Sequence, residues 1–157
     1  MISAVLATRD DARRLGETLA ALVPAAVDGL VRQVIIADAG STDRTLEVAD
    51  DAGATLVSGD LRAGIAAARE RWLLILDPGA RLPSGWDDLV RAHISGGDRA
   101  GVIRIGPRRG LLSLMAPAPA VGLLTPRGEI GDGATLGELA RSARSPATLK
   151  IVARLAV

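Results

Sequence analysis

The sequence contains no cysteine, so the chain can form no disulfide and carry out no thiolate chemistry. It also lacks phenylalanine and tyrosine, and its aromatic residues are Trp72 and Trp86. A core must therefore be built from Leu, Ile, Val and Ala, and base stacking on aromatic platforms is almost excluded. Because His93 is the one histidine, a multi-histidine metal site within one chain is excluded too. These absences argue against thiol enzymes, multi-histidine metal centres and binding of single-stranded nucleic acid.

Neither sign of charge dominates, since 19 Lys and Arg face 18 Asp and Glu. No basic field is present to attract nucleic acid, and we expect no such partner. The absence of cysteine fits a reducing compartment, and the early charges of MISAVLATRDD do not suit a signal peptide. The expected location is the cytoplasm. A length of 157 residues predicts one domain over 1–157 with a sizeable core.

An uncharged segment, Gly110 to Pro126, approaches the length of a membrane span. Pro117 and Pro119 lie in its middle and would break a helix. We interpret the segment as a buried or interfacial connection. The alternative is a surface that contacts a second copy of the chain or the inner face of a membrane, which would make the protein peripheral.

Short apolar runs alternate with helical patterns through the first half of the chain. This order predicts βαβ units, and hence an α/β fold with a mostly parallel sheet flanked by helices. The predicted strands are 2–7, 30–37, 54–57 and 72–76, and the helices end near Leu22, span 44–52 and span 62–71. In the second half we expect helices at 87–95 and 134–143, strands at 101–105 and 120–125, and an apolar element of open type at 149–157.

Local signals set some of these boundaries. Pro24 is expected to end the first helix. Asp43 is expected to cap the helix that begins at Arg44, with Leu46 and Val48 facing inward.

Two aspartates follow the two strongest predicted strands: Asp38 after 34–36 and Asp77 after 72–76. In a parallel sheet both would lie at the same edge, where open α/β sheets bind ligands. Carboxylates gathered at one edge need a cation or hydrogen-bond donors, so the pair indicates a binding site. The alternative is that both residues only cap the turns that follow them.

At this point the sequence resembles a known family. ADAGSTDRT at 37–45 looks like the DDGSTDGT segment of family-2 glycosyltransferases, which have the GT-A fold. The opening ISAVLATRDDARRLGETLAAL is similar to their first strand and helix, GIAAARERWLLILD to the helix and strand before their metal motif, and DPGARLPSGW to DADTRLPPGW. The resemblance covers residues 2–90, a nucleotide-binding half, and leaves 91–157 as a divergent, shortened acceptor half.

The resemblance implies a nucleotide-sugar donor lying across the strand ends and an inverting sugar transfer. A divalent cation, Mn²⁺ or Mg²⁺, would offset the charge on the leaving diphosphate. Asp77 matches the first acid of the Asp-x-Asp metal motif, and Asp38 matches the acid that contacts the base or ribose. The other residues that the resemblance places at the nucleotide are Thr8, Asp10, Gly40, Ser41 and Arg62, the last as a displaced stand-in for a family arginine.

The sequence also departs from the family. Gly79 stands where the second acid of the metal motif would be, and Ala39 where many members have an Asp. In the tail, Glu138 aligns with a later acid, which puts the catalytic base position on Leu136. The alternative bases are Asp132 and Glu129, in the Gly-rich turn before it.

Three interpretations follow. The first is a glycosyltransferase of the family-2 type with an unknown acceptor. The second is a pseudoenzyme that keeps the fold and binds a nucleotide or a protein partner, favoured by Gly79 and Leu136. A generic Rossmann-type domain is the weakest, because no G-x-G-x-x-G follows the first strand.

Overall fold

The computed structural model describes residues 1–106, 120–131, 133–143 and 146–152. Its seven strands form one sheet in the order β3-β2-β1-β4-β6-β5-β7. Four of the six neighbouring pairs are parallel, so the predicted α/β fold with a mostly parallel sheet is confirmed. The strands are β1 (Ile2–Thr8), β2 (Val31–Asp38), β3 (Thr55–Ser58), β4 (Trp72–Leu76), β5 (Gly101–Gly106), β6 (Ala120–Pro126) and β7 (Ala147–Val152).

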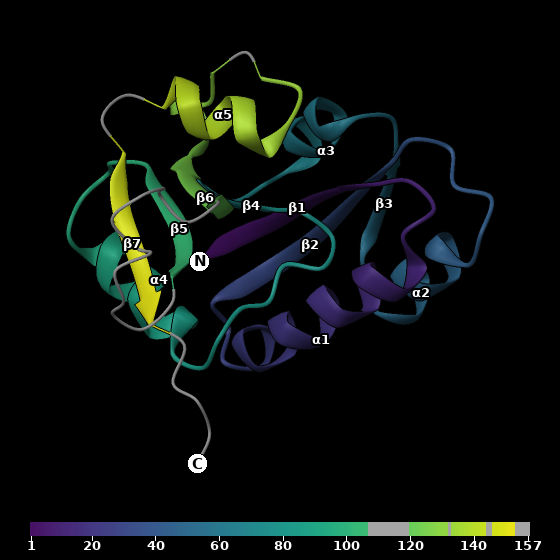
Figure 1. Ribbon diagram of the computed structural model, residues 1–157, viewed down its shortest axis with the longest axis horizontal. Helices are drawn as coiled ribbons and strands as arrows, with labels where there is room; N and C mark the ends of the chain where they lie inside the picture. The colour runs from purple at the N-terminus through teal and green to yellow at the C-terminus, as the bar shows by residue number, and fades with distance from the viewer. Residues whose placement is uncertain (107–119, 132, 144–145, 153–157) are drawn as a thin grey trace.

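Helices cover both faces of the sheet (Figure 1). They are α1 (Ala12–Val27), α2 (Thr45–Asp51), α3 (Leu61–Ala67), α4 (Trp86–Ser95) and α5 (Leu136–Ser142), with a short 3₁₀ turn, η2 (Arg127–Glu129). On one face α1, α2 and α4 pack on the sheet through residues such as Leu15, Ala49 and Val90. On the other, α3 and α5 pack through Leu61 and Leu139. The result is a three-layer α/β/α arrangement with an aliphatic core.

Strands β1, β2 and β4 are the buried centre of this fold. Their apolar, β-branched runs suit strands that are covered on both faces, and all five residues of β4 are buried. Because β1 is parallel to both β2 and β4, the carboxyl ends of the three strands meet at one edge.

The close packing of α3 on the sheet depends on Gly64. A Cβ at Gly64 would lie 2.9 Å from Val5 Cγ1 and 3.1 Å from Ala37 Cβ. The helix ends at Ala67, well before the predicted end at 71, because Ala68 is already extended.

Two other local expectations are wrong. Pro24 lies inside α1, which continues to Val27. Its helical φ is compatible with the helix, and its carbonyl accepts a hydrogen bond from the Asp28 N–H at 2.9 Å. In α2, Leu46 is 41% exposed, whereas Thr45 and Ala49 are the buried residues, with Val48 partly buried as expected.

The second half of the chain supplies an antiparallel insertion. Strand β6 runs antiparallel to both β4 and β5. Residues 149–152 of the element of open type belong to β7, which is parallel to β5, and 153–157 lie outside the described residues. Residues 110–119 of the predicted connection lie outside the described part. Residues 120–126 are β6, which is interior to the sheet and largely buried, so they offer no surface for a membrane or a second copy. Among the described helices, none is long and apolar enough to cross a membrane.

Candidate functional site

The site predicted from the sequence lies where β1, β2 and β4 end. We call Thr8, Asp38 and Asp77 the carboxyl edge. Thr8 pairs with Asp38 across β1 and β2, and Leu6 pairs with Leu76 across β1 and β4, so Asp77 follows at the next position. With strands about 4.8 Å apart, the two aspartates flank Thr8 at a strand-to-strand separation of about 10 Å. The edge therefore forms as the parallel order predicted.

Asp38 is buried and engaged within its own loop. Its Oδ2 accepts hydrogen bonds from the Gly40 N–H at 3.0 Å and the Ser41 N–H at 2.9 Å, and its Oδ1 accepts one from the Ser41 hydroxyl. Burial raises the pKa of Asp38, but the hydrogen bonds from Ser41 and Gly40 outweigh burial and hold the pKa below its ordinary 3.8. Gly40 has a φ of +89°, which favours glycine at this turn.

Asp10 joins the loop after β1 to the loop after β2. Its Oδ1 accepts hydrogen bonds from the Thr42 N–H at 2.7 Å, the Thr42 hydroxyl at 3.2 Å and the Asp43 N–H at 3.3 Å. Its own N–H donates to the Ser41 hydroxyl at 2.9 Å. Asp10 has a φ of +52°, in the left-handed region that Asp tolerates better than most residues. The two loops are thus held together as one unit.

Asp43 accepts hydrogen bonds from the first residues of two helices, whose N-cap residues are Asp11 and Arg44. Its Oδ1 accepts from the N–H and the hydroxyl of Thr45, and its Oδ2 accepts from the Ala12 N–H at 3.2 Å. The Thr45 hydroxyl is the main cause that holds the pKa of Asp43 below its usual value. The sequence predicted a cap on the second helix, which begins at Thr45 rather than Arg44. Because Asp43 also occupies the N-terminus of α1, that end already has its anion.

Thr8 is the unsatisfied group of the carboxyl edge. Its side chain is buried, with 5% of its surface exposed, and its Oγ1 has no hydrogen-bond partner among the described residues. Its backbone carbonyl, by contrast, accepts from the Ala39 N–H at 3.0 Å. A buried hydroxyl without a partner costs free energy, so it marks a position where a ligand could supply the missing bond.

Asp77 differs from Asp38 because its carboxylate accepts no hydrogen bond from the part of the chain that the structure describes. Desolvation by the atoms around the carboxylate raises the pKa of Asp77 above 3.8, and the positive charge of Arg14 opposes this with a smaller effect. Asp77 is therefore a carboxylate available for interaction at the carboxyl edge.

A tight turn follows Asp77. The Ala80 N–H donates to the Asp77 carbonyl at 3.0 Å, Pro78 is the second residue, and Gly79 has a φ of +87°. Pro followed by a residue of positive φ is the pattern of a type II turn. Thr18 on α1 fixes the turn, since its hydroxyl accepts from the Gly79 N–H at 2.8 Å. The residue at 79 is thus set by turn geometry.

Arg14 lies across this turn. Its carbonyl accepts from the Gly79 N–H at 3.0 Å, and a Cβ built on Gly79 would lie 2.9 Å from Arg14 Nε. Its Nη1 also pairs with Asp11 Oδ1 at 3.3 Å. Sequence reasoning missed Arg14. A signal was present in the sequence: the first turn of α1 carries two arginines, Arg13 and Arg14, and no acid. Positive charge at a helix N-terminus is unfavourable because of the helix dipole.

Arg62 lies at the same edge as Asp38. It follows β3, which pairs with β2 at Ser58 and Asp38, and it occupies the first turn of α3 with an exposed side chain. Asp60 caps this helix by accepting from the Arg62 N–H at 3.1 Å and the Ala63 N–H at 3.2 Å.

The structure does not bring Glu129, one of the two proposed bases, to the carboxyl edge. Glu129 follows β6, whose last residue, Pro126, pairs with Trp72 at the start of β4. That position lies about 16 Å along β4 from Asp77, at the opposite edge of the sheet. Asp132 lies outside the described residues.

The tail residues that align with family acids have structural roles. Leu136, the first residue of α5, is buried in the core. Glu138 accepts from the Ala134 N–H at 2.8 Å, while the Thr135 hydroxyl accepts from the Glu138 N–H at 3.3 Å. This is a capping-box arrangement, and the Ala134 hydrogen bond is the main cause that lowers the pKa of Glu138.

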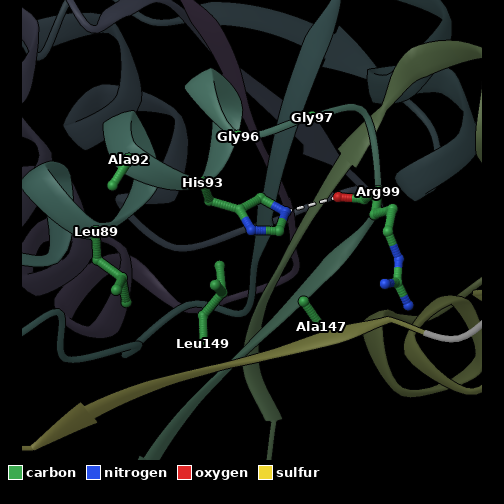
Figure 2. A pocket seen from close by; sticks show the side chains of 8 residues that line it. All are labelled: Leu89, Ala92, His93, Gly96, Gly97, Arg99, Ala147 and Leu149. Carbon is green, nitrogen blue, oxygen red and sulfur yellow. Dashed lines mark hydrogen bonds between the residues drawn. The ribbon is translucent and has the colours of Figure 1, made fainter.

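A separate pocket of about 390 Å³ lies between α4 and β7 (Figure 2). The His93 Nε2 donates to the Arg99 carbonyl at 2.6 Å, so this nitrogen is engaged. None of the residues predicted from the sequence as site residues lines the pocket. Its lining is Leu89, Ala92, His93, Gly96, Gly97, Arg99, Ala147 and Leu149.

Comparisons with known proteins place this geometry in a fold group. No protein-family model matches the sequence, and no curated protein is significantly similar to it. A solved structure of glucosyl-3-phosphoglycerate synthase from Mycobacterium tuberculosis, in complex with Mn²⁺, UDP and phosphoglyceric acid, matches with a TM-score of 0.71 at 20% identity, over 100% of this chain and 70% of that chain.

Two further structures agree. The same synthase with Mn²⁺, UDP-glucose and phosphoglyceric acid gives a TM-score of 0.67 at 21% identity, over 100% of this chain and 72% of that one. A structure described as a mycobacterial protein gives 0.73 at 22% identity, over 98% and 66%. At such identities the likeness shows the fold, which is that of GT-A glycosyltransferases.

Proposed function

We propose that this chain binds a nucleotide-sugar donor at the carboxyl edge and acts as a glycosyltransferase. The observation that carries the proposal is the unpartnered Thr8 hydroxyl, buried between two strands that end in aspartates. A nucleoside offers hydroxyl and carbonyl groups that can complete such a bond. Asp38, Gly40 and Ser41 form the wall on one side of Thr8, and Asp77 stands on the other.

The fold supports a nucleotide as the ligand. The synthase with the same fold is described in complexes with UDP and with UDP-glucose. Open α/β sheets bind ligands outside the carboxyl ends of their strands, which is where Thr8 and Asp38 lie. Asp10 would act by holding the two loops in place, and Arg62, exposed at the same edge, is available to the donor.

In the proposed transfer, an acceptor oxygen bonds to the anomeric carbon while the bond to the diphosphate breaks. The acceptor proton passes to a carboxylate base, for which Asp132 and Glu129 remain the candidates. Glu129 would require the acceptor half to approach from the far edge of the sheet, and Asp132 lies outside the described residues.

A divalent cation at Asp77 does not fit the residues present. The similar structures contain Mn²⁺. In this chain the matching motif offers one carboxylate, Asp77, and has glycine at the position of the second acid. Among the described residues no group of three or more His, Asp or Glu could hold a metal. We therefore assign no step to a metal ion.

The second candidate function is a pseudoenzyme that binds the nucleotide without turnover. The burial of Leu136 and the use of Glu138 as a helix cap favour it, because both occupy the region aligned with the family's catalytic base. Slow hydrolysis of UDP-glucose by the purified protein would separate the two, since binding alone releases no UDP.

The proposal is tested by calorimetric titration with UDP of the wild type and of Thr8→Val. Valine keeps the shape of threonine and removes the hydroxyl. We expect the wild type to bind, and the variant to bind about 3- to 10-fold more weakly, as befits one hydrogen bond of about 0.5–1.5 kcal/mol. Thr125→Val is the matched control, since Thr125 is also buried, on β6. Equal UDP affinity of wild type and Thr8→Val would refute the role of the hydroxyl.

A further inference from the structure

The turn after β4 disfavours a second acid at position 79. A residue other than glycine at 79 would need a φ of +87°, which L side chains rarely adopt. Its Cβ would also lie 2.9 Å from Arg14 Nε and 3.5 Å from both Arg14 Cβ and Arg14 Nη2. The guanidinium therefore occupies the volume into which a side chain at position 79 would extend.

The backbone of Arg14 is bound to this turn, and its side chain makes one ion pair. Its backbone carbonyl accepts from the Gly79 N–H, and Thr18, one turn further along α1, accepts from the same N–H. Its guanidinium pairs with Asp11. Arg14 thus moves with the turn that carries Asp77, and its charge acts on that carboxylate.

These observations place a guanidinium beside Asp77. A guanidinium keeps its positive charge at all ordinary pH values. It repels a divalent cation that would approach Asp77, and it presents N–H donors suited to phosphate oxygens.

We infer that the Asp77 end of the carboxyl edge is metal-free, and that Arg14 provides there the positive charge for the diphosphate of the ligand. The part of the inference that concerns the diphosphate rests on the proposed function, whereas the exclusion of the metal does not. It follows that nucleoside diphosphates bind this chain equally well with and without a divalent cation.

The first test is titration of the full chain with Mn²⁺ alone, followed by electron paramagnetic resonance. We expect no bound Mn²⁺ at Asp77. One Mn²⁺ bound per chain, and lost in Asp77→Asn, would overturn the inference whether or not the protein binds nucleotides. The result therefore separates a failure of this inference from a failure of the proposed function.

The second test is titration with UDP in EDTA and in excess Mn²⁺. We expect the same affinity in both, and about a tenfold weaker affinity in Arg14→Gln, because a charged hydrogen bond to phosphate is lost. Arg13→Gln is the matched control, since Arg13 is 81% exposed and pairs with Glu17 at 2.7 Å. Tighter binding in Mn²⁺ that requires Asp77, or equal losses in the two arginine variants, would contradict the inference.

Discussion

Asp38 and Asp77 end two strands of one sheet and lie on either side of Thr8, yet their surroundings differ. Asp38 is buried and accepts three hydrogen bonds from Gly40 and Ser41. Asp77 accepts none from the described residues and has the charge of Arg14 nearby. The pKa is lowered at Asp38 and raised at Asp77.

The two carboxylates therefore differ in whether they hold their own loop together or are available to a ligand. The carboxylate of Asp38 shapes its loop, and a ligand would meet the loop already formed. The carboxylate of Asp77 is not needed for the turn, which is held by backbone bonds and by Thr18. Two acids that the sequence presents as a matched pair thus have different surroundings: Asp38 is engaged by its own loop, whereas Asp77 accepts no hydrogen bond from the described residues.

The largest expected effect is on folding. Asp38→Ala leaves the Gly40 and Ser41 N–H groups without their acceptor, and we expect a loss of about 2–4 kcal/mol in the free energy of unfolding. Asp77→Ala should change it by about 0.5 kcal/mol or less, as for a surface substitution. Urea denaturation of both variants measures this. Similar losses would remove the distinction between the two aspartates.

Thr18→Val tests the anchor of the turn at Asp77. The Thr18 hydroxyl accepts from the Gly79 N–H, which keeps a second acceptor in the Arg14 carbonyl. We therefore expect a loss of about 1–2 kcal/mol in urea denaturation, together with weaker UDP binding if the turn contacts the ligand. An unchanged free energy of unfolding would mean that backbone bonds alone fix the turn.

Thr8→Val should have the opposite effect on stability. The variant removes a buried hydroxyl that has no partner, so we expect the unligated protein to gain about 0.5–1 kcal/mol. The gain should appear as a higher urea midpoint without UDP and diminish with UDP present. A loss of stability would show that the Thr8 hydroxyl is satisfied in the free protein.

The smallest effect concerns acid stability. The pKa of Asp38 is lowered on folding, so its ionised form stabilises the fold above its ordinary pKa of 3.8, and this contribution is lost as the pH falls through the folded value. The stability difference between wild type and Asp38→Asn should therefore narrow as the pH falls below about 4. At neutral pH the wild type should be no more stable to unfolding than Asp77→Asn, because folding raises the pKa of Asp77 and the ionised form of Asp77 therefore does not stabilise the fold. Acid titrations of the three proteins, followed by circular dichroism, compare these outcomes.

The central strands and their parallel direction could be predicted from the sequence because buried parallel strands leave unbroken apolar runs, such as 34–36 and 72–76. The edge that joins Asp38 and Asp77 followed from that order. The prediction that Pro24 ends α1 was wrong, since the helix continues past it to Val27. Leu46 was placed inward because its helix is too short to show a clear apolar face.

The hydrogen bonds and side-chain contacts within the site could not be predicted, because they join distant parts of the chain. Arg14 and Gly79 are far apart in sequence and meet only through the packing of α1 on the turn after β4. The acceptors that Asp10 and Asp43 supply also cross between two loops. A sequence pattern gives the residue type at each position, but not which hydrogen bonds are already made.

The central claim is that the carboxyl edge binds a nucleoside diphosphate without a metal ion. An NMR titration of ¹⁵N-labelled protein with UDP in EDTA tests it most directly. The account predicts amide shifts at Thr8, at Gly40 and Ser41, and at Gly79. No shifts at these residues, or shifts confined to the pocket around Leu89 and His93, would contradict it.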